Sequence, residues 1–138
     1  PATEGGEGEG DVVPDERAAA LERAWEAYRS ADYERARGLL QPLRAADPDD
    51  PESLYLAGLI GLAAGDLEAA IDELEDAAGL GEARAGFYLG FALYELGDRA
   101  AARRALEHFL RVADERDSRL AVRARGLLKN LERGEDKP

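Results

Sequence analysis

The stretch "YLGFALYELGDRAAARRALEHF", residues 88–109, places glycines inside and at the end of segments that otherwise have the apolar spacing of helices. An interior glycine costs a helix roughly 1 kcal/mol relative to alanine. Gly90 lies in the middle of the first segment, and Gly97-Asp98 separates that segment from the second. Glycines kept at such a cost serve close packing or tight turns. The stretch therefore predicts two closely packed helices joined by a short turn.

Helical spacing continues on both sides of this stretch, and strand patterns are absent from the sequence. Short breaks at Gly, Asp and Pro divide the chain into seven expected helices: 16–30, 33–46, 51–64, 67–78, 83–96, 99–114 and 118–132. Because short connections favour antiparallel neighbours, the sequence predicts an all-α fold built as a stack of helical hairpins.

The hairpins repeat one another. The second helix of each carries three apolar positions spaced by four and three residues: Ala36, Leu40 and Leu43; Ala70, Leu74 and Ala77; Ala102, Leu106 and Phe109. Upstream, two small residues recur seven positions apart: Ala24 and Ala31, Gly58 and Gly65, Gly90 and Gly97. Ala36 lies 34 residues before Ala70, which lies 32 residues before Ala102. Three units in register predict three copies of one hairpin.

These units resemble the tetratricopeptide repeat, whose period is 34 residues. The resemblance covers about residues 17–114, although only the first repeat ends in the family's Asp-Pro, at Asp47-Pro48. It implies an α-α superhelix of three hairpins over residues 16–117, covered at its end by a capping helix, 118–133. Leu127 and Leu128 are then expected to pack on the third hairpin. Gly134 leaves open that this helix begins a fourth repeat.

The family pattern also gives each glycine a role. Gly58 and Gly90 are expected where the two helices of a hairpin cross closely. Gly65 and Gly97 are expected just past a helix end, in the left-handed conformation that glycine adopts at little cost. The aspartates that follow are expected to cap the next helices by accepting hydrogen bonds from their first N–H groups: Asp66 and Asp98.

Composition excludes several classes of function. The net charge of −12 argues against a nucleic-acid binder, which needs many Lys and Arg contacts. No apolar run approaches the roughly 20 residues that span a membrane, so we expect no membrane insertion. His108 is the only histidine and there is no cysteine. With no phosphate-binding loop or metal-ligand cluster either, we expect no cofactor, no metal and no enzymatic activity.

The ends and the charge distribution add further expectations. Residues 1–15 are rich in Gly and Glu and predict a flexible acidic tail or linker, and 134–138 predict a short tail. Acids without bases occupy the helix near 67–78, whereas 118–132 is rich in Arg. The Ala-, Arg- and Gly-rich composition suggests a bacterial protein. The start without Met suits a domain exported or tethered at the cell envelope, although the cytoplasm stays open.

In the tetratricopeptide family, the first helix of each hairpin lines a concave groove that binds peptides. The resemblance therefore implies nine groove residues, three from each repeat: Leu21, Trp25 and Tyr28; Tyr55, Leu59 and Leu62; Phe87, Phe91 and Tyr94. Such an apolar, aromatic-lined groove predicts an adaptor or scaffold that binds a protein or peptide with apolar side chains. Two alternatives remain: the stripe is core, or the groove or an end face takes a second copy of the chain as a homodimer.

One subclass of the family is disfavoured. Chaperone-binding members hold a C-terminal carboxylate with a clamp of Lys, Asn and Arg in the groove. Here the one asparagine, Asn130, and the two lysines, Lys129 and Lys137, all lie outside the three repeats. The sequence therefore predicts a partner of another kind.

Overall fold

The computed structural model describes residues 14–134, and the predicted tails lie outside this range except at their inner ends. A short 3-10 helix, Glu115–Asp117, precedes the last of the α-helices, which are α1 (Pro14–Arg29), α2 (Tyr33–Ala46), α3 (Pro51–Ala64), α4 (Leu67–Gly79), α5 (Ala83–Leu96), α6 (Arg99–Val112) and α7 (Ser118–Glu132). Each end lies within two residues of its predicted position. The all-α fold class is thus confirmed for the described residues.

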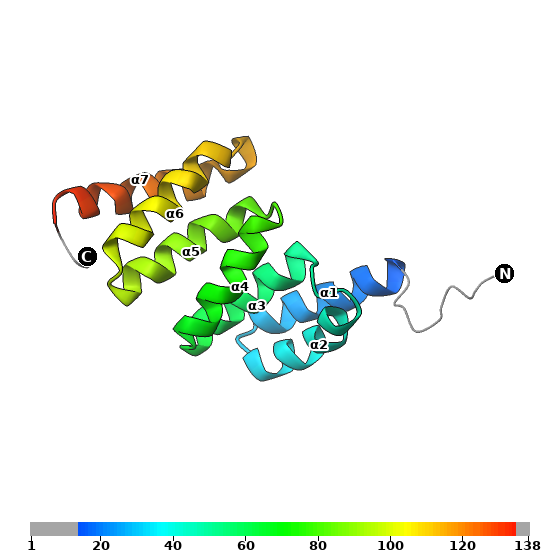
Figure 1. Ribbon diagram of the computed structural model, residues 1–138. Helices are drawn as coiled ribbons and strands as arrows, with labels where there is room; N and C mark the ends of the chain where they lie inside the picture. The colour runs from blue at the N-terminus through cyan, green and yellow to red at the C-terminus, as the bar shows by residue number, and fades with distance from the viewer. Residues whose placement is uncertain (1–13, 135–138) are drawn as a thin grey trace.

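The helices form three antiparallel hairpins, α1–α2, α3–α4 and α5–α6, stacked one after another with α7 at the end (Figure 1). The first helices of the hairpins also touch one another, α1 against α3 and α3 against α5. α7 packs on both α5 and α6. This is the arrangement of a helical-repeat solenoid closed by a capping helix.

Close approach within the second and third hairpins depends on Gly58 and Gly90. A Cβ atom at Gly58 would lie 2.5 Å from Cγ of Leu74, and one at Gly90 would lie 2.5 Å from Cδ2 of Leu106. Both leucines are fully buried. The close crossing of helices predicted at the two glycines is therefore confirmed.

Replacing Gly90 with alanine is expected to lower the free energy of unfolding by about 1–3 kcal/mol, because the new methyl group overpacks the contact with Leu106. The matched control is Gly126→Ala in α7, where nothing lies within 4 Å of the added Cβ. That change should raise stability by roughly 0.5–1 kcal/mol through helix propensity. Denaturant titration of both variants measures the difference, and a Gly90→Ala protein as stable as the control would contradict the close packing.

The turns inside the three hairpins share a left-handed residue. Gly65 and Gly97 have φ values of 89° and 95°, as predicted, and the first hairpin uses Ala31 at a φ of 63°. A residue with a Cβ is strained in this region by roughly 1–2 kcal/mol. The first turn therefore carries strain that the other two avoid.

Changing Ala31 to glycine is expected to raise the free energy of unfolding by about 0.5–1 kcal/mol, the strain relieved less the greater chain entropy of glycine. The reverse exchange, Gly97→Ala, should lower stability by a similar amount at the corresponding turn. Thermal or urea unfolding would measure both. Opposite signs support the strained turn, and a loss of stability in Ala31→Gly would refute it.

The predicted helix caps are only partly right. Asp98 caps α6, since its Oδ1 accepts from the N–H of Ala101 at 3.2 Å. Asp66 makes no such bond to α4. Its Oδ2 instead pairs with Nη2 of Arg37 in α2, at 2.8 Å. The capping prediction for Asp66 is wrong because a cation from the neighbouring hairpin competes for its carboxylate.

A network of hydrogen bonds and an ion pair around Asp50 joins the first two hairpins. Its carboxylate accepts from the backbone N–H and the hydroxyl of Ser53, at 2.9 and 2.7 Å, and pairs with Arg17 at 3.1 Å. Arg17 also donates to the carbonyl oxygen of Leu43. Burial alone would raise the pKa of Asp50, but the hydrogen bonds from Ser53 and Arg17 outweigh it and lower that pKa. This network connects the start of α1 to the turn between α2 and α3.

The capping helix buries one apolar face on the third hairpin. Leu131 is buried, and Leu127 and Leu128 lie partly buried against the same cluster as Phe87 and Phe109. Arg99 of α6 donates to the carbonyl oxygen of Leu131 at 3.0 Å. The expected packing of Leu127 and Leu128 is confirmed.

Candidate functional site

The helices α1, α3 and α5 together form what we call the inner face. A row of aromatic rings passes through the three hairpins, partly at this face and partly in the core, and its consecutive ring centroids lie between 4.9 and 6.1 Å apart. The row contains seven of the nine aromatic residues of the chain, in this order: Tyr33, Tyr28, Trp25, Tyr55, Tyr88, Phe87 and Phe109. Ring pairs at these separations attract beyond the burial of their area. The row therefore couples all three hairpins.

Trp25 is the centre of the row in the first hairpin. Its ring lies edge-on to Tyr28 at 6.0 Å and tilted against Tyr55 at 5.8 Å. Its indole N–H donates to a carboxylate oxygen of Glu52 in α3, at 3.0 Å. The ring is only partly buried. A fixed aromatic side chain with an accessible surface is suited to binding an apolar group at little entropic cost.

A cation lies beside the row between α3 and α5. The guanidinium of Arg84 is 4.5 Å from the ring centroid of Tyr55 and is held by two hydrogen bonds to Glu82, at 2.7 and 3.0 Å. The hydrogen bonds to Glu82 raise the pKa of Arg84. Burial raises the pKa of Tyr55. At neutral pH the inner face thus combines neutral aromatic rings with the ion pair of Arg84 and Glu82.

The nine predicted groove residues divide into two groups. Five are partly buried and remain at the inner face: Leu21, Trp25, Tyr28, Leu62 and Phe91. Four are buried in the core, so their predicted position in an open groove is wrong: Tyr55, Leu59, Phe87 and Tyr94. For these four, the alternative that the stripe is core is correct.

Packing from elsewhere in the chain accounts for the buried group. Phe87 contacts the ring of Phe109 in α6, and the guanidinium of Arg123 in α7 lies 4.8 Å from its ring centroid. Tyr94 belongs to the same cluster, and its hydroxyl has no hydrogen-bond partner among the described residues. Residues of α6 and of the capping helix thus cover positions that helical spacing alone places on one face.

Two residues of the inner face were not among the residues predicted from the sequence. Tyr88 is partly buried and links the second and third hairpins through the ring of Tyr55, at 6.1 Å. Arg84 lies one turn before it on α5. Tyr88 follows a predicted groove residue directly, so a shift of one residue in register would have included it. No sequence signal distinguishes Arg84 from the other arginines.

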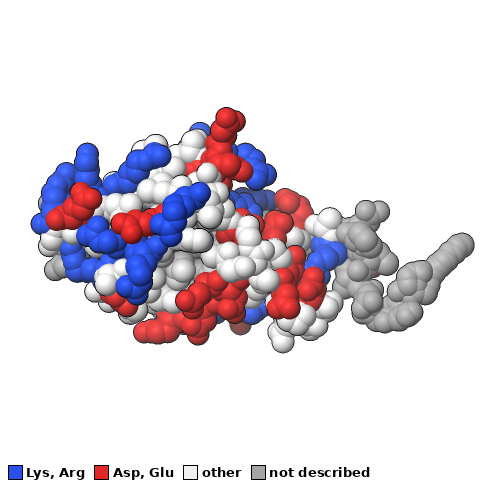
Figure 2. All heavy atoms as spheres, turned by 45° about the horizontal axis from the view of Figure 1, so that its top comes forward, with Lys and Arg blue, Asp and Glu red and all other residues white. Residues whose placement is uncertain are grey.

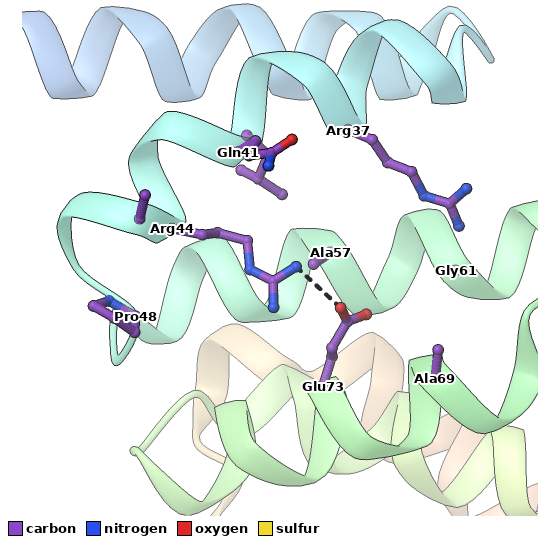
Figure 3. Close-up of a pocket in the computed structure, with 10 residues that line it drawn as sticks. Arg37, Gln41, Arg44, Pro48, Ala57, Gly61, Ala69 and Glu73 are labelled. Atoms are coloured by element: carbon purple, nitrogen blue, oxygen red, sulfur yellow. Dashed lines mark hydrogen bonds and ion pairs between the residues drawn. The ribbon is translucent and has the colours of Figure 1, made fainter.

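Apart from the inner face, the surface has a hollow between α2 and α4, on the other side of α3 (Figure 3). Its volume is about 600 Å³. The ion pair between Arg44 of α2 and Glu73 of α4, at 3.1 Å, crosses it. Its other lining residues are Arg37, Leu40, Gln41, Ala45, Pro48, Ala57, Gly61 and Ala69.

Comparison of the repeats explains this hollow. Its floor is formed by Ala57 and Gly61 of α3. The corresponding residues of α5, 32 positions later, are Leu89 and Leu93. Both leucines are partly buried and pack against the core clusters. The hollow therefore marks where the second repeat lacks two side chains that the third repeat has.

Within residues 14–134, no group of three or more His, Cys, Asp or Glu is placed to hold a metal ion. In the same part of the chain, no helix has the length and apolar character needed to cross a bilayer. His108 is exposed on α6. The described surface therefore offers aromatic and charged side chains for binding.

Comparisons with known proteins agree with this geometry. The family model of the tetratricopeptide repeat matches residues 21–85. The translocator chaperone SycD of Yersinia enterocolitica superimposes with a TM-score of 0.85 at 22% identity, covering 95% of this chain and 94% of that chain. PcrH of Pseudomonas aeruginosa gives 0.81 at 20% identity, covering 87% and 94%. The Sgt2 domain of Aspergillus fumigatus gives 0.73 at 19%, covering 93% and 88%. No curated protein sequence matches the chain.

The match and the helix order show a helical-repeat fold similar to that of tetratricopeptide-repeat proteins. Residues 21–85 match the tetratricopeptide repeat, and the described helices are arranged as three hairpins and a capping helix, as the sequence predicts. The resemblance to the three solved structures, near 20% identity, establishes the fold of the chain.

Proposed function

We propose that this chain is a non-catalytic scaffold that binds a peptide segment of a partner protein on its inner face. The aromatic row carries the proposal, because its partly exposed rings on α1 and α5, Trp25 and Tyr88, both contact the buried ring of Tyr55 that lies between them. Aromatic anchors supply much of the binding energy at protein interfaces. The partner's side chains are then apolar, with a carboxylate or carbonyl group able to meet Arg84.

Solved structures of similar fold support the proposal by what they hold. SycD has been solved in complex with a peptide of the translocator YopD, and PcrH in complex with the chaperone-binding region of PopD. Repeat solenoids of this kind bind extended segments because stacked repeats present a long surface. We infer the same mode of binding here, and we leave the identity of the partner to the experiment.

Trp25 is the only tryptophan, so its emission reports binding at the inner face directly. A random peptide library without tryptophan would be panned against the full chain, and selected peptides titrated while Trp25 emission is followed. Phe91→Ala and Leu62→Ala are expected to weaken binding about tenfold or more, as loss of interface anchors does. Leu80→Ala is the matched control, because Leu80 is an exposed leucine at the end of α4.

The hollow between α2 and α4 supplies the contrasting result. Ala57→Leu would place in the hollow the side chain that the third repeat carries at Leu89. The proposal expects this variant to bind the selected peptides normally. If the selected peptides bind Phe91→Ala with unchanged affinity but no longer bind Ala57→Leu, the binding site is the hollow. That result would overturn the assignment to the inner face.

A further inference from the structure

Charge is separated along the described chain. Residues 14–98 contain seven Lys and Arg against nineteen Asp and Glu, a net charge of −12. Residues 99–134 contain ten against five, a net charge of +5. Figure 2 shows cations crowding the end of the molecule formed by α6 and α7, with acids over much of the remainder of this face. The molecule has a basic end and an acidic body.

The two parts also differ in how their charges are paired. Five of the seven arginines in residues 14–98 are in ion pairs: Arg17, Arg29, Arg37, Arg44 and Arg84. On α7, by contrast, Arg119, Arg125 and Lys129 are exposed and make no ion pair within the described part of the chain. These cations therefore have no anionic partner among residues 14–134.

The outer surface of α7 has a defined shape, which we call the α7 strip. Val122 and Gly126, four residues apart, form its centre line, and Val122 is 65% exposed. Residues four apart lie above one another on a helix. Cation pairs with the same spacing flank the centre line on either side: Arg119 and Arg123, and Arg125 and Lys129. The strip is thus a line of small apolar residues between two rows of positively charged side chains.

Within residues 14–134, no packing contact or backbone conformation requires a glycine at position 126. Nothing lies within 4 Å of a Cβ added there, and its φ is not in the left-handed region. A glycine in the middle of a helix costs roughly 1 kcal/mol relative to alanine. Close approach by another backbone is the remaining use for a glycine at such a site. Together with the cations, this indicates that a second helix or chain lies along the strip.

An element of the chain itself matches this strip. α4 has 13 residues against the 15 of α7, so the two helices are similar in length. It exposes acids spaced by four, three and one residues, none of them in an ion pair within residues 14–134: Glu68, Asp72, Glu75 and Asp76. Like charges at this spacing weaken a helix, and a row of cations on each side would relieve that repulsion.

We propose that the α7 strip of one copy docks along α4 of a second copy. Although the whole chains repel each other as anions, the Debye length is about 8 Å at physiological ionic strength, so the local complementarity decides. The contact joins two different surfaces, so each pair of copies keeps one free α4 and one free α7 strip, and association continues head to tail. It leaves the inner face open and is independent of the peptide binding proposed above.

Charge reversal tests this contact. One variant reverses α7 by Arg119→Glu, Arg125→Glu and Lys129→Glu, and a second reverses α4 by Glu68→Lys, Asp72→Lys and Asp76→Lys. Arg123 stays unchanged because it covers the ring of Phe87. Sedimentation velocity of the wild-type chain is expected to show a mass that rises with concentration. Each triple variant should associate about tenfold more weakly or worse, and the chain carrying all six changes should associate again.

The matched control reverses Arg23 and Arg35, exposed arginines of α1 and α2 outside any ion pair in the described residues. It should associate like the wild type. A second variant, Gly126→Leu, blocks the centre line without changing charge, and should abolish association while unfolding at the same or higher denaturant concentration.

Three results would overturn the proposal. The first is a wild-type chain that stays monomeric up to millimolar concentration. The second is association that survives either triple variant or Gly126→Leu. The third is a monomer that binds phosphatidylserine vesicles through Arg119, Arg125 and Lys129, which would assign the strip to a membrane surface instead of a second copy.

Discussion

The Phe87→Ala variant is expected to lose about 3–5 kcal/mol of unfolding free energy, which is the cost of truncating a buried phenylalanine. Phe87 is fully buried and contacts Phe109 of α6, Tyr88 of its own helix and Arg123 of α7. Removing its ring leaves a cavity where three helices meet. Denaturant titration followed by circular dichroism measures the loss.

Phe91→Ala is the matched control, because Phe91 is the same residue type one turn later on α5 and is only partly buried. Its loss should be about half as large or less, since less apolar area returns to water. Equal losses in the two variants would show that Phe91 is as much a core residue as Phe87. A small loss in Phe87→Ala would contradict the burial described here.

Ending the chain after Asp117, which removes α7, is expected to lower stability by several kcal/mol or to cause aggregation. The helix buries Leu131 and partly buries Leu120, Leu127 and Leu128, and each large apolar side chain that is fully buried contributes roughly 1.5–3 kcal/mol. Its loss also uncovers the cluster around Phe109. Calorimetry of the truncated chain checks this result.

A chain that ends after Glu132 is the control for this truncation. It keeps the whole of α7 and should melt within a few degrees of the wild type, since surface residues change stability little. A chain lacking α7 that remains monomeric with an unchanged melting temperature would show that α7 is dispensable for the third hairpin.

The helix bounds were predictable because local chemistry sets them. Gly65 and Gly97 end helices in the left-handed conformation, and Asp98 caps the next one. Each of these signals acts within a few residues along the chain. Even the largest errors, two residues at the start of α1 and at the end of α6, have a local character. At α6 the helix stops at Val112 because Asp114 begins a separate capping box with Asp117.

The candidate site was less predictable because it depends on neighbours distant in the sequence. Phe87 and Phe91 share one helical stripe, yet α7 covers the first and leaves the second partly exposed. Asp66 resembles Asp98 in sequence but meets Arg37 from another hairpin. Spacing along one helix does not record which residues from other helices lie above it. The inner face is therefore smaller than predicted and includes Tyr88 and Arg84 in addition.

The difference between Ala57 and Gly61 in α3 and their counterparts in α5, Leu89 and Leu93, has a consequence for the order in which the molecule opens. In a linear array, each hairpin is stabilised by its own fold and by the interface with its neighbour. The interface without the two leucines couples its neighbours less tightly than the one that has them. We therefore expect the α1–α2 hairpin to separate at a lower free energy than the global transition. Because Trp25 lies in that hairpin, one end of the inner face would unfold and refold reversibly while the remainder of the stack stays folded.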